Sequence, residues 1–176
     1  MRININEKGS EAFYREVVNV AVQYRALMKQ PDRKLKDYFK GLKVYGAICG
    51  VLFILCALMG IFWGFDALII AALVISFLAT FVSVRSYMSM KKMLDSYLAD
   101  ERSSVLVLDE EGVELDKEDG QIVRMTWGNV SFVRTFEEAV CFISDQPVGF
   151  MISCLRKYQP EIYAYLKENQ IKLKII

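Results

Sequence analysis

The sequence lacks histidine entirely and has few cysteines and prolines. Among 176 residues there are four cysteines, three prolines and no histidine. The absence of histidine excludes the common zinc sites and any Cys–His nucleophile pair, and four cysteines are too few for a small disulfide scaffold. The sequence also contains no phosphate-binding loop and no G-x-S-x-G nucleophile motif. We therefore expect no catalytic, cofactor-binding or metal-binding residues, and a protein that is not an enzyme.

Charge is missing from the middle of the chain. Residues 44–65 and residues 67–84 carry no charged side chain, and Asp66 lies between them. As helices, with ~1.5 Å rise per residue, these segments would span about 33 and 27 Å, close to the ~30 Å hydrocarbon core of a bilayer. The pattern predicts a transmembrane hairpin over residues 44–84 with a tight turn at residues 64–66. The alternative is a buried hairpin in a soluble protein, but helices in soluble cores keep a polar face.

Basic residues flank this segment on both sides, whereas the turn has none. The excess of Lys and Arg on cytoplasmic loops predicts a multi-pass protein of the plasma membrane with both termini in the cytoplasm. Tyr45 and Tyr87 at one end, and Trp63 and Phe65 at the other, occupy positions typical of aromatic belts. The flanking basic residues are Arg33, Lys34, Lys36, Lys40, Lys43, Arg85, Lys91, Lys92 and Arg102.

Small residues recur along both predicted spans. Gly46 and Gly50, and again Gly60 and Gly64, have GxxxG spacing. Small side chains let helix backbones approach closely. We expect the two stripes to pack against each other within the hairpin, with homodimerisation as the alternative use. Ala57 belongs to the first stripe, and the second consists of Ala72, Ser76, Ala79 and Ser83.

The segments beside the hairpin predict further helices. Residues 10–29 have apolar side chains at helical spacing, with Ser10 as the N-cap. Residues 32–43 place lysines opposite apolar side chains, which predicts a short interfacial helix. An apolar stripe, rich in methionine, predicts that the second span continues through residues 85–102 to about Leu98. We expect this stripe to pack against residues 10–29 rather than to bind a metal or a variable partner.

Apolar and polar side chains alternate at the N-terminus, in residues 2–6, as in a half-buried strand. The only other sheet is predicted in residues 103–153, so this strand must pair there. We expect Ile3 and Ile5 to face the core of that domain, which makes the hairpin an insertion into one cytoplasmic domain. A frayed N-terminus is the alternative.

Residues 103–176 predict a small cytoplasmic α+β domain. Apolar residues alternate with polar ones, and the Asp-Gly pair in residues 117–120 readily supplies the positive φ of a hairpin turn. After this strand meander, Pro160 opens a C-terminal helix whose apolar residues include Ile162, Tyr163, Leu166 and Ile171. The predicted strands are residues 104–108, 113–115, 121–127, 130–136, 139–144 and 148–153.

A few side chains suggest chemistry, but each has a simpler structural interpretation. We expect the cysteines to be reduced thiols packed as small apolar groups rather than metal or redox ligands. Trp127 is expected to close the core, with an aromatic ligand platform as the alternative. Arg156 and Lys157 could contact lipid phosphate, but the net charge of −4 on residues 103–176 argues against specific phosphoinositide binding. The carboxylate pair at residues 137–138 indicates a solvated turn.

Two short motifs carry a family resemblance. Glu111-Gly112-Val113 precedes a polar hairpin, and Trp127-Gly128-Asn129-Val130 follows it. With the hairpin and the alternating strands, these motifs resemble the YcxB-like family of bacterial membrane proteins. Residues 152–156 lack a proline that this family often has after the last strand. The resemblance implies two membrane helices followed by a cytoplasmic domain similar to a pleckstrin-homology (PH) fold, and it implies no defined activity.

Together these patterns predict a membrane-anchored, non-enzymatic interaction or regulatory protein that presents a PH-like module at the inner membrane face. The expected partners are the lipid bilayer and a protein, with a homodimer as a further option. Nucleic acid is not expected, because no basic face is interleaved with aromatic residues outside the membrane-flanking segments. The alternative is a small oligomeric channel or transporter-associated subunit. The predicted regions are an N-terminal strand and helices (1–43), the hairpin (44–84), a helix extension (85–102) and the PH-like domain (103–176).

Overall fold

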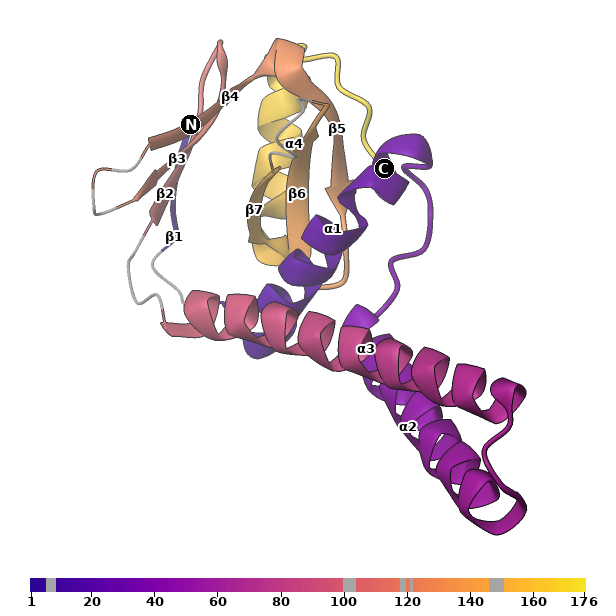
Figure 1. The fold of residues 1–176 in the computed structure, drawn as a ribbon. Helices are drawn as coiled ribbons and strands as arrows, with labels where there is room; N and C mark the ends of the chain where they lie inside the picture. Colours follow the sequence, from indigo (N-terminus) through magenta and orange to yellow (C-terminus); the bar gives the residue numbers. More distant parts are fainter. Residues whose placement is uncertain (6–8, 100–103, 118–119, 121, 146–150) are drawn as a thin grey trace. The chain divides into compact units, whose positions relative to one another are not determined.

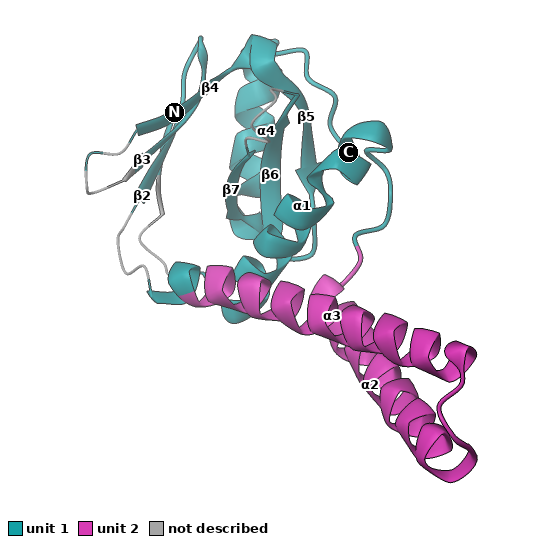
Figure 2. Cartoon of the chain, viewed as in Figure 1, with its two compact units in different colours: residues 1–35, 96–176 teal, residues 36–95 magenta. Residues whose placement is uncertain are grey.

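The computed structural model describes residues 1–5, 9–99, 104–117, 120, 122–145 and 151–176. The chain forms two compact units, coloured separately in Figure 2. Residues 1–35 and 96–176 make up one of them, the two-sheet unit, and residues 36–95 make up the other, the hairpin unit. In sequence, the hairpin unit is therefore inserted into the two-sheet unit.

Two long helices dominate the hairpin unit. α2 spans Tyr38–Trp63, and α3 spans Ala67–Ala99, the last turn of which belongs to the two-sheet unit. Both are long and apolar enough to cross a membrane, and α3 continues well beyond the second predicted span, as its apolar stripe indicated. The interfacial helix predicted over residues 32–43 is wrong. Residues 33–37 are irregular, and the remainder of that segment forms the first turns of α2.

Side-chain caps and one glycine fix the ends of these helices. Asp37 Oδ1 accepts a hydrogen bond from the Lys40 N–H at 3.2 Å, and Asp66 Oδ1 accepts one from the Ile69 N–H at 2.8 Å. Between the helices, Gly64 has a φ of 92°, a conformation that glycine adopts without steric cost. The turn predicted at residues 64–66 is therefore present. Asp66 is exposed in this turn and caps the N-terminus of α3.

The described strands of the two-sheet unit form two antiparallel sheets. The four-stranded sheet has the order β1-β2-β3-β4, and the three-stranded sheet has the order β5-β6-β7. A short 3-10 turn, Trp127–Asn129, separates β4 from β5. Parts of several predictions lie outside the described residues: residue 6 of the first strand, residues 100–102 of the helix extension, residues 118–119 of the hairpin turn, residue 121 of the third strand predicted in residues 103–153, and residues 148–150 of the last strand. The strands are β1 Arg2–Ile5, β2 Ser104–Leu108, β3 Gly112–Lys117, β4 Ile122–Thr126, β5 Val130–Thr135, β6 Ala139–Ser144 and β7 Met151–Leu155.

The N-terminal strand pairs with the first strand that follows the hairpin unit. Ile3 is the partner of Leu106 in the antiparallel register of β1 and β2. The terminal amino group of Met1 donates to the carbonyl oxygen of Leu108 at 2.6 Å. The predicted pairing is confirmed, and Ile3 is buried as expected. The side chain of Ile5 lies outside the described part of the chain.

Two apolar clusters form the core, one on each face of the three-stranded sheet. The two sheets and α4, Gln159–Glu168, enclose the first cluster. The second lies between the outer face of the three-stranded sheet and α1, Glu11–Lys29, which crosses that face in Figure 1. β6 is buried along its whole length, because Val140 and Phe142 enter the first cluster while Cys141 enters the second.

The helices of this unit agree with the sequence in their extent. Ser10 caps α1, since its Oγ accepts a hydrogen bond from the Phe13 N–H at 3.1 Å. The expected contact of α1 with the stripe over residues 85–102 is present at Tyr97, on which Tyr14 stacks with ring centroids 6.0 Å apart. The buried apolar side chains of α1 also cover the three-stranded sheet. Ile171, predicted within α4, lies beyond the end of that helix and packs against the first cluster.

Candidate functional site

The candidate site is the apolar surface of α2 and α3. Proteins folded in water rarely expose large contiguous apolar patches. Along the described ranges, all but five of the exposed large apolar side chains lie in residues 36–95, and the exposed fractions of Trp63 and Leu68 reach 78% and 81%. The five elsewhere are Met1, Val22, Tyr97, Ile122 and Ile175.

Exposure separates these helices from the core helices of a folded domain. Only 11% of the most apolar stretch of each helix is buried, whereas a core helix of the same composition would be mostly covered. α1 provides the contrast within this chain, because its apolar face is buried against the three-stranded sheet. The apolar side chains of α2 and α3 are therefore largely exposed rather than packed within the chain.

The hydroxyl groups of the second span are satisfied within α3 itself. Ser76 Oγ donates to the Ala72 carbonyl, Thr80 Oγ1 to the Ser76 carbonyl and Ser83 Oγ to the Ala79 carbonyl, each at 2.8 Å. Burying a polar group in lipid without a hydrogen-bond partner costs roughly several kcal/mol of free energy. These hydrogen bonds within the helix therefore make the hydroxyl groups compatible with a bilayer.

α2 and α3 pack as an antiparallel pair through a small set of contacts. One close approach is at Gly46, where a Cβ atom would lie 3.4 Å from the Cβ of Ser83. Aromatic pairs lie above and below this point along the hairpin. They are Phe39 with Tyr87, whose ring centroids are 6.2 Å apart, and Phe53 with Phe77, at 6.0 Å.

The predicted glycine stripe is only partly a packing face. Gly46 approaches α3, but a Cβ atom on Gly50 would meet nothing within 4 Å. The atoms nearest to a Cβ on Gly60 belong to the ring of Phe65 in the turn. The expectation that Gly50 brings the two spans together is therefore wrong. Spacing along the sequence places these glycines on one side of α2 but does not show which of them contacts α3.

A carboxylate in the two-sheet unit joins α1 to the turn between β5 and β6. Glu16 Oε1 accepts a hydrogen bond from the Glu137 N–H at 3.0 Å, and Oε2 accepts from the Glu138 and Ala139 N–H groups at 2.8 and 2.9 Å. Burial raises the pKa of Glu16, and the three hydrogen bonds oppose that rise. The side chains at residues 137–138 are exposed, as predicted, but no sequence pattern indicates that their backbone N–H groups bind a carboxylate of α1.

An arginine holds the segment between α1 and α2. The guanidinium of Arg134 donates to the carbonyl oxygens of Pro31 and Arg33, the latter at 2.9 Å, and lies 4.7 Å from the centroid of the Phe136 ring. These carbonyls are engaged by a side chain, so they are not available to a helix. This contact explains why the interfacial helix predicted from residue 32 does not form.

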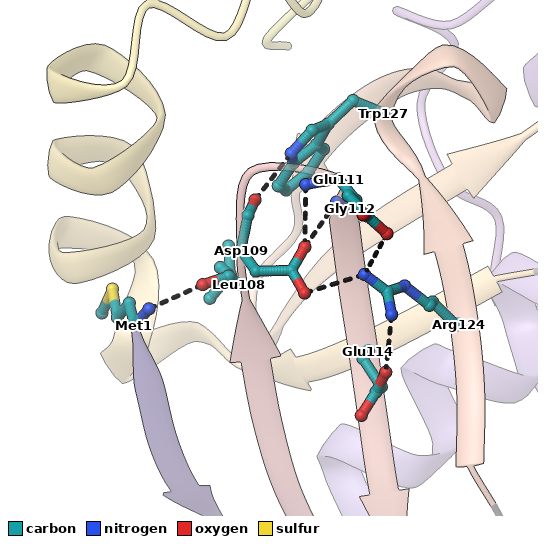
Figure 3. A network of polar contacts seen from close by, with 8 residues as sticks. All are labelled: Met1, Leu108, Asp109, Glu111, Gly112, Glu114, Arg124 and Trp127. Atoms are coloured by element: carbon teal, nitrogen blue, oxygen red, sulfur yellow. Dashed lines mark hydrogen bonds and ion pairs between the residues drawn. The ribbon is translucent and has the colours of Figure 1, made fainter.

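Trp127 has the structural role that the sequence favoured. Its ring packs against the first cluster, with its centroid 6.3 Å from that of Phe142. Its Nε1–H donates to the carbonyl oxygen of Asp109 at 2.9 Å, which ties the β2–β3 turn to the end of β4 (Figure 3). The ring of Trp127 therefore packs against apolar side chains, while its N–H has a hydrogen-bond partner.

Beside Trp127, a surface arginine gathers three carboxylates. Arg124 Nη2 lies 2.8 Å from Asp109 Oδ2 and from Glu111 Oε2, and its Nη1 lies 3.6 Å from Glu114 (Figure 3). Asp109 also accepts hydrogen bonds from two backbone N–H groups of its own turn. Arg124 balances only part of the carboxylate charge, and its contacts link the β2–β3 turn to strands β3 and β4.

The cysteines are free thiols, and the two in the two-sheet unit are buried. Cys141 and Cys154 lie in neighbouring strands but enter different clusters, so the sheet separates them. Burial raises the pKa of Cys154 to about 12 and that of Cys141 well above its ordinary value. Both are therefore inert packing groups. In the described ranges, no three His, Cys, Asp or Glu side chains gather as a metal site.

The two basic residues near the start of α4 are also engaged. Arg156 Nη1 donates to the Glu137 carbonyl oxygen at 3.2 Å, and Lys157 Nζ lies 4.9 Å from the centroid of the Tyr158 ring. Their side chains remain exposed, and no contact identifies a phosphate site there.

Comparison with known proteins yields no match, whether with protein-family models, curated proteins or solved structures. The resemblance to the YcxB-like family rests on the sequence motifs alone.

Proposed function

We propose that this chain is a membrane-anchored, non-enzymatic interaction or regulatory protein. α2 and α3 insert as a hairpin into the plasma membrane, and the two-sheet unit binds a protein partner at the inner face. The observation that carries this proposal is the exposure of large apolar side chains along α2 and α3. Removing such a surface from water is strongly favourable, and the hydrocarbon core of a bilayer covers it.

The length and charge of the helices support insertion. The charge-free residues 44–65 and 67–84 correspond to about the thickness of the hydrocarbon core. The internal hydrogen bonds of Ser76, Thr80 and Ser83 remove the polar cost of burying these hydroxyls. Lys and Arg flank the open end of the hairpin and are absent from its turn, which favours an orientation with both termini in the cytoplasm.

The connectivity supports a role as an anchored module. β1 and α1 precede the hairpin unit, β2 follows it, and all three belong to the two-sheet unit. The module is therefore tethered by two covalent connections. A strand meander that ends in a helix also agrees with the PH-like domain that the sequence resemblance implies.

The channel alternative has less support. A pore requires polar groups along a transmembrane face, but the described hydroxyls of the second span bond to their own helix. The charged residue between the spans, Asp66, lies in the turn and caps α3. No contact in the described residues favours a water-filled path.

Two cysteine placements test insertion and orientation. Phe65→Cys lies in the turn, and Asp116→Cys lies at an exposed position of β3. The native chain is the negative control for labelling, because two of its thiols lie within the proposed spans and two are buried in the core. A membrane-impermeant maleimide should label Phe65→Cys on intact cells and Asp116→Cys only after permeabilisation. The reverse pattern would overturn the orientation, and release of the chain by alkaline carbonate would overturn insertion.

A further inference from the structure

A group of exposed basic side chains lies at the open end of the hairpin unit. We call this group the basic collar and propose that it binds the anionic phospholipid headgroups of the cytoplasmic leaflet. The inference rests on the proposed function, because the collar reaches headgroups only when α2 and α3 span the bilayer. The collar consists of Lys36, Lys40, Lys43, Arg85, Lys91 and Lys92, all of them exposed.

Contacts between the helices place the two halves of the collar at one level. Lys43 Nζ lies 5.2 Å from the centroid of the Tyr87 ring, and the ring of Phe39 meets the same tyrosine edge-on. The first turns of α2 therefore lie beside residues 85–92 of α3. That stretch of α3 is about 10 Å long, so the collar is a narrow band rather than a scatter of charges.

The collar is the whole positive charge of the hairpin unit. Residues 36–95 contain six Lys and Arg, and all of them belong to it. The three carboxylates of the same residues are Asp37, Asp66 and Asp95. Asp66 lies in the turn at the opposite end, whereas Asp37, the N-cap of α2, and Asp95 lie toward the open end. The open end of the hairpin therefore carries a net charge of +4, while the closed end carries −1.

Charge and position together identify the occupant. The collar begins where the charge-free band ends, at Lys43 in α2 and Arg85 in α3, which is the depth at which headgroups begin. Long basic side chains can lay their methylene stems on the apolar band and extend their charge into the headgroup layer. An anionic membrane surface increases binding by about fivefold per nearby Lys or Arg, within a Debye length of ~8 Å. In an anionic leaflet, the hydrocarbon core would cover the charge-free residues of α2 and α3, and the negatively charged headgroups would meet the basic collar.

The test measures which lipid surrounds the full chain. The chain is reconstituted in vesicles of equimolar phosphatidylcholine and phosphatidylglycerol, and spin-labelled forms of each lipid report how strongly each associates with it. We expect the native chain to prefer phosphatidylglycerol several-fold, with a preference that declines as salt is added. The triple substitution Lys36→Gln, Lys40→Gln and Lys43→Gln should remove most of that preference.

A matched control removes the same charge elsewhere. Lys167→Gln, Lys172→Gln and Lys174→Gln replace three exposed lysines of the two-sheet unit and should leave the preference unchanged. Equal reduction in both triple variants, or no reduction in the collar variant, would overturn the proposal. So would a native chain that resists carbonate extraction yet shows no lipid preference, which would assign the collar to an acidic protein partner instead. A native chain that carbonate releases would overturn the proposed function itself.

Discussion

Ile3 lies directly opposite Leu106, although the entire hairpin unit separates them in the chain. Their side chains are 4% and 0% exposed, and both belong to the cluster enclosed by the two sheets and α4. The first residues of the chain therefore contribute to the core of the two-sheet unit. The segments before and after the hairpin are parts of one folded body.

We expect Ile3→Ala to lower the free energy of unfolding of the two-sheet unit by about 2–5 kcal/mol, because it removes most of a buried side chain. Chemical denaturation in detergent, followed by circular dichroism, measures the change. Arg2→Ala provides the control in the same strand, since its side chain is exposed. Equal losses in both variants, or rapid amide exchange throughout β1 in the native chain, would contradict a core role for this strand.

Glu16 predicts a pH-dependent term in stability. Burial raises its pKa above the ordinary value of 4.5, so the folded state holds this proton to a higher pH than the unfolded state does. The contribution of Glu16 to stability therefore falls as the pH rises through the interval between the unfolded and folded pKa values, and it is regained on acidification. Glu16→Gln should remove this slope, as measured by unfolding at a series of pH values. A difference between native and variant chains that is constant with pH would show that the group titrates alike in both states.

The helix contact predicts opposite outcomes for two neighbouring glycines. Gly46→Leu places a large side chain against Ser83 and should destabilise the hairpin by about 1–3 kcal/mol, the usual range for overpacking. Gly50→Leu extends into open space and should not. Both substitutions gain helix propensity to the same extent, so this gain cancels in the comparison. Thermal unfolding in detergent would refute the contact if the two variants behaved alike.

The turn at Asp109 predicts a difference between a half-buried and an exposed contact. Trp127→Phe removes the indole N–H from the Asp109 carbonyl and leaves a smaller ring against the first cluster, so we expect a lower denaturation midpoint. Arg124→Gln breaks several ion pairs, but these are solvent-exposed and contribute little, so its midpoint should stay near that of the native chain. A larger effect of Arg124→Gln would mean that the carboxylates depend on this arginine for the turn itself.

Local patterns in the sequence were sufficient for most elements. A charge-free run predicts a long apolar helix whatever surrounds it, and Ser10 marks the start of α1 because its cap involves only the next three residues. Alternation likewise predicted the strands, and the short alternating segment at Ile3 indicated its pairing. In each case the signal and the structure it determines lie within the same few residues or follow from a lack of other partners.

Contacts between distant segments were beyond the reach of such patterns. Periodicity showed that α1 has an apolar face but not that the three-stranded sheet is its partner. The break of the meander into two sheets, the binding of residues 137–139 by Glu16, and the capture of the Pro31 carbonyl by Arg134 depend on tertiary placement. Spacing also grouped Gly46 with Gly50, although only the first approaches α3.

The pairing of β1 with β2 sets an order of events during synthesis. β1 and α1 are synthesised before the hairpin, and the described strands that they pack against are synthesised after it. In the proposed topology, the hairpin enters the membrane while the apolar face of α1 is still uncovered and β1 has no partner. Insertion then brings both ends of the hairpin to one side of the bilayer, which shortens the effective loop that β1 and β2 must close. In the proposed topology, the two-sheet unit can therefore be completed only after the hairpin has been synthesised.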